Sequence, residues 1–230
     1  MKSHLFSHSL LPQAAQSFAS LTALEKAFEQ MSNQKVVNLS AKCFGNTYIA
    51  TRLFEFVTKV KPEFVYLQFT GVLRVDMPFD KRFKITDYPH QVQTPFHNWV
   101  GSGGMKGPWL RHNFTEKHFG KLHDVLSNNY HGLVLSSMKN IFSAVELCKS
   151  LSIPFAWTTY YDYLDPPNHM IKLNDGIITS WPDYIDMTNR LPESPLNYAY
   201  DIKEEPDDEC HFSQETFIKY LNKHKKQIAL

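Results

Sequence analysis

Hydrophobic residues recur at every third or fourth position in several parts of the chain, which is the spacing of the buried face of a helix. In the first such segment the apolar residues run from Phe18 to Met31, and in the last they include Phe217, Tyr220 and Leu221. The pattern predicts amphipathic helices near residues 14–31, 49–60, 119–126, 141–148 and 213–225.

Short apolar and β-branched runs separate these helices. The clearest is Phe64–Thr70, a continuous apolar run typical of a strand that is buried on both faces of a parallel sheet. The remaining expected strands cover Met1–Phe6, Val36–Leu39, Leu133–Leu135 and Ile153–Thr159. Strands that alternate with helices predict an α/β fold with three layers, α/β/α, in which helices cover both faces of a mainly parallel five-stranded sheet.

Periodicity is lost in two stretches, near residues 71–113 and 162–206, which are punctuated by proline. We therefore expect a single domain over residues 1–230 with two irregular insertions. Ligands in parallel α/β folds bind beyond the carboxyl ends of the strands, and long loops in compact domains are usually functional or mobile. The loops after the first three strands and before the last helix are therefore the expected location of a site.

Composition excludes several classes of protein. The 24 Lys and Arg residues nearly balance the 23 Asp and Glu residues and form no basic run, so we expect no nucleic-acid partner. No segment approaches the roughly 20 apolar residues of a membrane-spanning helix, and Met1–Leu11 has too short an apolar core for a secretory signal. Three widely separated cysteines, Cys43, Cys148 and Cys210, predict a cytoplasmic location without a disulfide framework.

Neither a metal nor an organic cofactor is expected. The 11 histidines form no H-E-x-x-H motif, and no Cys-x-x-Cys accompanies them. The glycine-rich segment Gly101–Gly107 does not fit the phosphate-binding pattern G-x-x-x-x-G-K-[ST]. With Trp99 and Trp109 on either side, this segment is a candidate lid or sugar-stacking loop, or else an ordinary surface loop.

Hydroxyl, imidazole and carboxylate groups occur near the two ends of the chain. Ser7 follows the first expected strand, and Asp208 and His211 precede the last expected helix. Acyl transfer to a serine requires a base within hydrogen-bond reach and a carboxylate that orients the imidazole. Ser7 is therefore a candidate nucleophile, although serine is also common in turns, and an acidic residue near a helix N-terminus is favoured by the helix dipole.

These segments resemble the conserved blocks of the SGNH (GDSL-type) hydrolases, serine esterases and acyltransferases on a flavodoxin-like three-layer fold. Asp208–His211 resembles the D-x-x-H that precedes the final helix, and Phe6–Ser9 resembles a first block of the form G-C-S-H-[ST]. Asn38–Asn46 is similar to the second block, N-L-x-x-x-G-x-x-N. The resemblance implies a Ser7–His211–Asp208 triad without a cofactor.

The resemblance also implies an oxyanion hole, which would combine the backbone amide of Ser7 and the amides of the Cys43–Gly45 turn with the side chain of Asn46. The chain departs from the family here, because Cys43 stands where the glycine of the second block falls. The third block, G-x-N-D in the family, is Gln68–Gly71 and lacks the asparagine donor. Loss of one such donor costs about 10²–10³ in rate in a serine protease.

Two further residues are candidates for contact with a substrate. Thr70 lies in the third block, and Arg74 follows it closely and is able to pair with an anionic substrate group or with a loop carboxylate. The sequence therefore predicts a serine hydrolase of acyl esters, with a carbohydrate or other small molecule as the substrate. An acyltransferase acting on a glycan is the nearest alternative, and a non-catalytic SGNH-like binding or assembly protein with a degraded oxyanion hole is another.

Overall fold

A parallel β-sheet lies at the centre of the molecule. The computed structural model describes residues 4–5, 19–33, 35–40, 44–72, 74, 76–80, 91–93, 97–101, 130–160, 170–172, 178–180, 184–204 and 212–228. Within these residues the sheet has the order β1-β2-β6, formed by β1 (His4–Leu5), β2 (Val65–Phe69) and β6 (Phe155–Thr159). Val65 is paired with Phe155 and Phe69 with Thr159, so β2 and β6 are in register over their full length.

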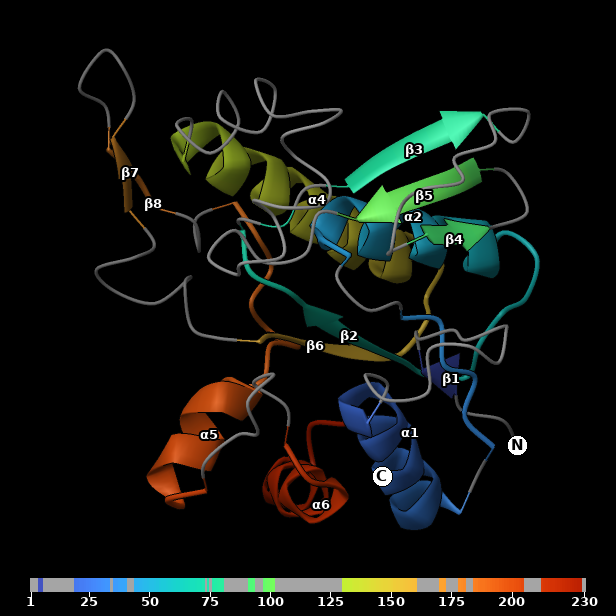
Figure 1. Cartoon of the computed structure of the whole chain (residues 1–230), viewed down its shortest axis with the longest axis vertical. Helices are drawn as coiled ribbons and strands as arrows, with labels where there is room; N and C mark the ends of the chain where they lie inside the picture. The colour runs from blue at the N-terminus through green and yellow to red at the C-terminus, as the bar shows by residue number, and fades with distance from the viewer. Residues whose placement is uncertain are drawn as a thin grey trace.

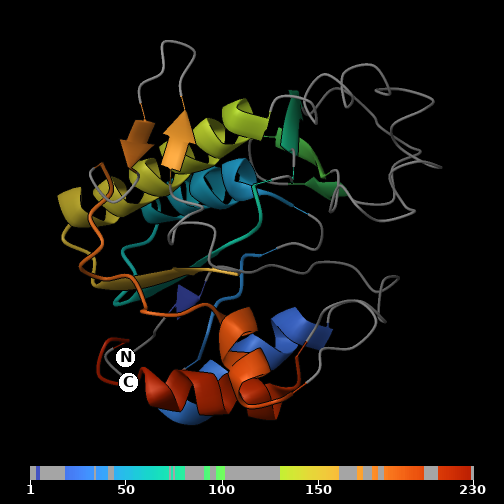
Figure 2. The ribbon, with the colours of Figure 1, turned by 90° about the vertical axis from the view of Figure 1, so that its left-hand side faces the viewer.

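Helices cover both faces of this sheet, and the molecule is therefore a mixed α/β protein (Figure 1). α2 (Asn46–Val57) and α4 (Tyr130–Ser150) lie on one face, whereas α1 (Ala19–Ser32), α5 (Pro195–Asp201) and α6 (Gln214–Lys223) lie on the other, as Figure 2 also shows. Successive side chains of a strand point to opposite faces. Accordingly, Leu67 and Trp157 are buried against α2 and α4, whereas Tyr66 and Ala156 are buried with residues of α1, α5 and α6.

Several expected elements are confirmed. The helix expected near 49–60 is α2, the strand expected over Phe64–Thr70 is β2, and the strand expected over Ile153–Thr159 is β6. The helices expected near 14–31, 141–148 and 213–225 correspond to α1, α4 and α6, although α4 is much longer than expected. The helix expected near 119–126 lies outside the described residues.

Two expected strands are wrong. Leu133–Leu135 belongs to α4, where the buried residues Leu133, Val134, Ser137 and Met138 follow helical spacing. A short apolar run does not distinguish a buried helix from a strand, and here the longer helical periodicity prevails. Val36–Leu39 forms no strand in the part of the chain that the structure describes, although Val36 and Leu39 are buried.

The two stretches expected to be irregular contain regular structure. The first includes β3 (Asp76–Asp80), β4 (Gln91–Gln93) and β5 (His97–Gly101), which form an antiparallel sheet of order β3-β5-β4. The second includes the pair β7 (Met170–Lys172) and β8 (Ile178–Ser180), as well as α5. Pro78 lies in β3, an edge strand of the small sheet, which is where a residue without a backbone N–H is tolerated.

Candidate functional site

Asn46, the first residue of α2, joins three elements through its side chain. Its Nδ2 donates to the carbonyl oxygen of Thr70 (3.1 Å) and to Oγ of Ser137 on α4 (3.0 Å), and its Oδ1 accepts from the backbone N–H of Thr70 (2.8 Å). Asn46 is 3% exposed and Ser137 is 5% exposed. The Asn46 amide therefore links α2, the end of β2 and α4 in a buried network, and both of its amide hydrogens are engaged within the protein.

Asp76, at the start of β3, caps the N-terminus of α2. Its carboxylate accepts backbone N–H groups from Gly45 and from Tyr48, the latter at 2.9 Å. Burial raises the pKa of Asp76 to about 7, because desolvation outweighs the backbone donors and the nearby charge of Arg74, which favour the ionised form. The carboxylate thus occupies the helix terminus that would otherwise be open to an external anion.

Gly45 allows this close approach. A Cβ atom at this position would lie 2.5 Å from the carbonyl oxygen of Arg74 and 2.9 Å from Oδ2 of Asp76. Because the nearest of these atoms is backbone, a side chain cannot be accommodated by a change of rotamer. The absence of a side chain at Gly45 therefore brings the segment around Arg74 directly against the start of α2.

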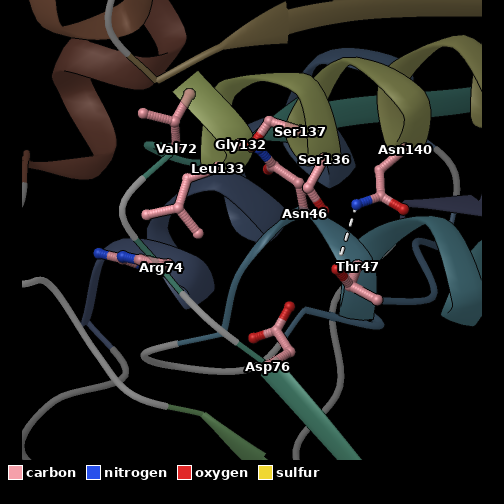
Figure 3. A pocket seen from close by; sticks show the side chains of 10 residues that line it. All are labelled: Asn46, Thr47, Val72, Arg74, Asp76, Gly132, Leu133, Ser136, Ser137 and Asn140. Atoms are coloured by element: carbon pink, nitrogen blue, oxygen red, sulfur yellow. Dashed lines mark hydrogen bonds between the residues drawn. The ribbon is translucent and has the colours of Figure 1, made fainter. Parts of the chain in front are cut away.

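A pocket of about 230 Å³ lies between the start of α2 and the first turns of α4 (Figure 3). Ser136, Ser137 and Asn140 project from α4 toward Asn46 and Thr47, and Nδ2 of Asn140 donates to Oγ1 of Thr47 at 3.1 Å. The described residues that line it are Asn46, Thr47, Val72, Arg74, Asp76, Gly132, Leu133, Ser136, Ser137 and Asn140. Of these ten, Arg74 is the cation and Asp76 the acid, while most of the others offer hydroxyl or amide groups.

The carboxyl edge of the parallel sheet borders this region. Thr70 follows β2 directly, and the backbone N–H of Tyr160, which follows β6, donates to the carbonyl oxygen of Phe69 at 2.7 Å. The ring of Tyr160 stacks on that of Phe212, with centroids 6.4 Å apart, and Phe212 is buried just ahead of α6. Phe212, which precedes the N-cap residue of α6, therefore lies at the edge of the sheet where β2 and β6 end.

The structure describes half of the residues that the sequence singled out. Gly45, Asn46, Thr70 and Arg74 are brought together at the start of α2, whereas Ser7, Cys43, Asp208 and His211 lie outside the described residues. Thr70 takes part through its backbone. The Asn46 side chain and the Gly45 N–H, both expected to face an oxyanion, have Thr70, Ser137 and Asp76 as partners instead.

Asp76, Ser137 and Asn140 belong to this site, although the sequence did not single them out. Asp76 lies only two residues after Arg74, but no local pattern marks it as the cap of a helix that begins 30 residues earlier at Asn46. Ser137 follows Leu133–Leu135 closely, and because that run predicts a strand, the sequence does not place Ser137 on a helix facing Asn46. Helical spacing through residues 133–148 would have placed Ser137 and Asn140 near one face of a single helix.

No family model, curated protein or solved structure matches this chain. In the part of the chain that the structure describes, no three His, Cys, Asp or Glu residues are grouped so that they could hold a metal ion. None of the described helices has both the length and the apolar character needed to cross a membrane.

Proposed function

We propose that the chain is an SGNH-type serine hydrolase that cleaves acyl esters of carbohydrates or other small molecules. Ser7 is the nucleophile, His211 the general base and Asp208 the residue that orients His211. One observation carries the proposal: Phe212, the neighbour of His211, lies at the carboxyl edge of the sheet, β1 runs toward that edge ahead of Ser7, and the same edge carries the Asn46 network and the pocket.

The described neighbours of the triad support this convergence. β1 ends at Leu5, two residues before Ser7, and runs parallel to β2. Leu5 is paired with Tyr66, three residues before the end of β2 at Phe69, so the chain leaves β1 in the direction of the carboxyl edge of the sheet. His211 is covalently bonded to Phe212, which is stacked on Tyr160 at the end of β6. An SGNH-type triad requires Ser7 and His211 to meet at this edge.

The proposed fold is the five-stranded, flavodoxin-like sheet of that family. Beyond β6, Asn189–Leu191 runs parallel to it, because Trp157 N–H donates to Asn189 O (3.0 Å) and Leu191 N–H donates to Trp157 O (2.8 Å). At the other edge, Val36 and Leu39 are buried in the clusters on opposite faces of the sheet, as in a strand beside β1. A flavodoxin-like sheet of strand order 2-1-3-4-5 needs one further strand on each side of β1-β2-β6. These two segments are the candidates for those positions, although Val36–Leu39 forms no strand among the described residues.

In the proposed reaction Ser7 Oγ attacks the ester carbonyl while His211 accepts its proton. The alcohol leaves with a proton returned by His211, and water then releases the acyl group from Ser7 by the same steps in reverse order. Because Gly45 N–H and the Asn46 amide are engaged by Asp76, Thr70 and Ser137, the oxyanion is left to the backbone amides of Ser7 and Cys43. Asn46 acts here as a positioning residue.

The engaged donors also favour a second candidate, a non-catalytic SGNH-like binding or assembly protein. In that case the pocket is retained for binding, and the oxyanion hole is no longer complete. A glycan acyltransferase differs from the hydrolase only in the acceptor, since a sugar hydroxyl replaces water in the second step. Release of free acid in the presence and absence of sugar acceptors separates these two activities.

The proposal is tested by labelling with a fluorophosphonate, which reacts with activated serines. We expect the wild-type protein to be modified at Ser7 and the label to be lost in Ser7→Ala and His211→Ala. Ser9→Ala and His8→Ala are matched controls from the same short segment, and they should retain the label. A folded wild-type protein that takes no label at Ser7 would refute the hydrolase and support the binding protein.

A further inference from the structure

We propose that Arg74 makes the pocket between α2 and α4 a subsite for a carboxylate, so that the ester substrate carries an anionic group on a short chain. The ester part of this inference rests on the proposed function, whereas the carboxylate subsite itself does not.

Among the described residues, the guanidinium of Arg74 has hydrogen-bond donors without a partner. Arg74 is half-buried and lines the pocket, and among the described residues its side chain makes one long hydrogen bond, from Nη1 to the carbonyl oxygen of Phe44 at 3.5 Å. A guanidinium has five N–H donors arranged as a planar fork that matches a carboxylate. Leaving such donors without partners in a partly desolvated site is costly, and a bound anion removes that cost.

Asp76 does not neutralise Arg74 by a direct ion pair among the described residues. Its carboxylate instead accepts the backbone N–H groups of Gly45 and Tyr48. The raised pKa of Asp76, caused mainly by burial, further reduces its negative charge around neutral pH. Arg74 therefore supplies positive charge to the pocket that Asp76 compensates only in part.

The backbone that carries Arg74 is held firmly. The carbonyl oxygen of Arg74 packs so closely against Gly45 that a Cβ atom on Gly45 would lie 2.5 Å from it. The backbone N–H of Arg74 donates to the carbonyl oxygen of Gly71 at 3.3 Å. A fixed backbone limits the positions that the guanidinium can reach, so less conformational entropy is lost when a ligand binds. The side chain of Arg74 therefore starts from a fixed point beside the pocket that it lines.

The rest of the pocket limits the ligand to a small polar molecule. In Figure 3 Val72, Leu133 and Arg74 lie toward one side of the pocket, and Asn140 lies with Thr47 toward the other. The volume of about 230 Å³ is below the roughly 300–1,000 Å³ typical of sites for drug-sized ligands. A short aliphatic segment against Val72 and Leu133 with a carboxylate at Arg74 matches this arrangement.

Direct binding tests the subsite without any requirement for catalysis. Succinate is the probe, and succinamide, which has the same length and no charge, is the matched control ligand, both measured by calorimetry. We expect succinate but not succinamide to bind, with affinity reduced about 10- to 100-fold in Arg74→Gln and less in Arg74→Lys. Lys139→Gln removes an exposed positive charge from α4 outside the pocket lining and should leave succinate binding unchanged.

Kinetics then connects the subsite to the ester. Mono-4-nitrophenyl succinate and 4-nitrophenyl butyrate have acyl chains of equal length, and only the first ends in a carboxylate. We expect kcat/KM to favour the succinate ester in the wild-type protein and in Lys139→Gln, and this preference to fall about 10- to 100-fold in Arg74→Gln. Circular dichroism and thermal unfolding of each variant establish that it is folded.

The outcomes separate the two proposals. Arg74-dependent binding of succinate by a protein that takes no fluorophosphonate label supports the subsite and refutes the hydrolase. Hydrolysis of the butyrate ester, with no binding of succinate and no preference between the two esters, refutes the subsite and leaves the hydrolase intact. Succinate binding that is equal in the wild-type protein and both Arg74 variants also refutes the subsite.

Discussion

Replacement of Asn46 by alanine is the most informative single perturbation of this molecule. The substitution removes three hydrogen bonds at once, two to the backbone of Thr70 and one to Oγ of Ser137. The site is buried, so water cannot readily replace the lost partners. An intramolecular hydrogen bond contributes about 0.5–1.5 kcal/mol, and a buried group left unpaired costs about 1–3 kcal/mol. We therefore expect Asn46→Ala to lower the free energy of unfolding by about 2–4 kcal/mol.

The measurement is equilibrium unfolding in urea, combined with a double-mutant cycle between Asn46 and Ser137. Ser137→Ala removes only the acceptor on α4 and should cost about 1 kcal/mol. The cycle should give a coupling energy of about 0.5–1.5 kcal/mol, since each residue is a hydrogen-bond partner of the other. Asn140→Ala is the matched control, because it removes a neighbouring amide with a single bond to Thr47 and should cost less than about 1 kcal/mol.

Activity measurements separate the positioning role of Asn46 from that of an oxyanion donor. A donor to the oxyanion would give a fall in kcat of about 10²–10³ with most of the stability retained. The positioning role predicts a large loss of stability and a coupling to Ser137. A free energy of unfolding unchanged to within about 0.5 kcal/mol, or a coupling energy near zero, would refute the buried network as an element of stability.

Three further outcomes are expected. Gly45→Ala should destabilise the protein by at least about 1–3 kcal/mol, because its Cβ would meet the Arg74 carbonyl oxygen at 2.5 Å; denaturation equal to wild type would contradict this. The pKa of Asp76 is about 7 in the native protein and lower in the unfolded chain. The free energy of unfolding should therefore fall by up to about 4 kcal/mol as the pH rises from about 4 to 7. This pH dependence of the free energy of unfolding should be absent in Asp76→Asn. Ser213→Ala removes the N-cap side chain of α6, which accepts a hydrogen bond from Thr216 N–H at 3.1 Å. We expect the free energy of unfolding, measured by thermal denaturation, to fall by about 1 kcal/mol; an unchanged value would show that the cap does not stabilise the helix.

Local pattern accounts for the elements that the sequence predicted well. The β2 run is apolar because both of its faces are buried, and α6 begins at a serine whose side chain caps the helix. Such signals depend on a few neighbouring residues and can therefore be read without knowledge of the tertiary contacts. The three apolar residues Leu133–Leu135 fit a strand and a buried helix equally well, and only the 21-residue length of α4 shows that they are helical.

The candidate site depends on contacts between residues far apart in the chain. Asn46 was found from the sequence, yet its partners Thr70 and Ser137 are 24 and 91 positions away. Asp76 caps a helix to which it has no local connection. The sequence by itself predicted α1, α2, α6 and the central strands β2 and β6, because periodicity of side chains is a local property. Only the tertiary structure decided that the Asn46 side chain is hydrogen-bonded to Thr70 and Ser137 and that Arg74 lines a pocket. The reason is that hydrogen-bond partners and desolvation depend on which distant segments pack together.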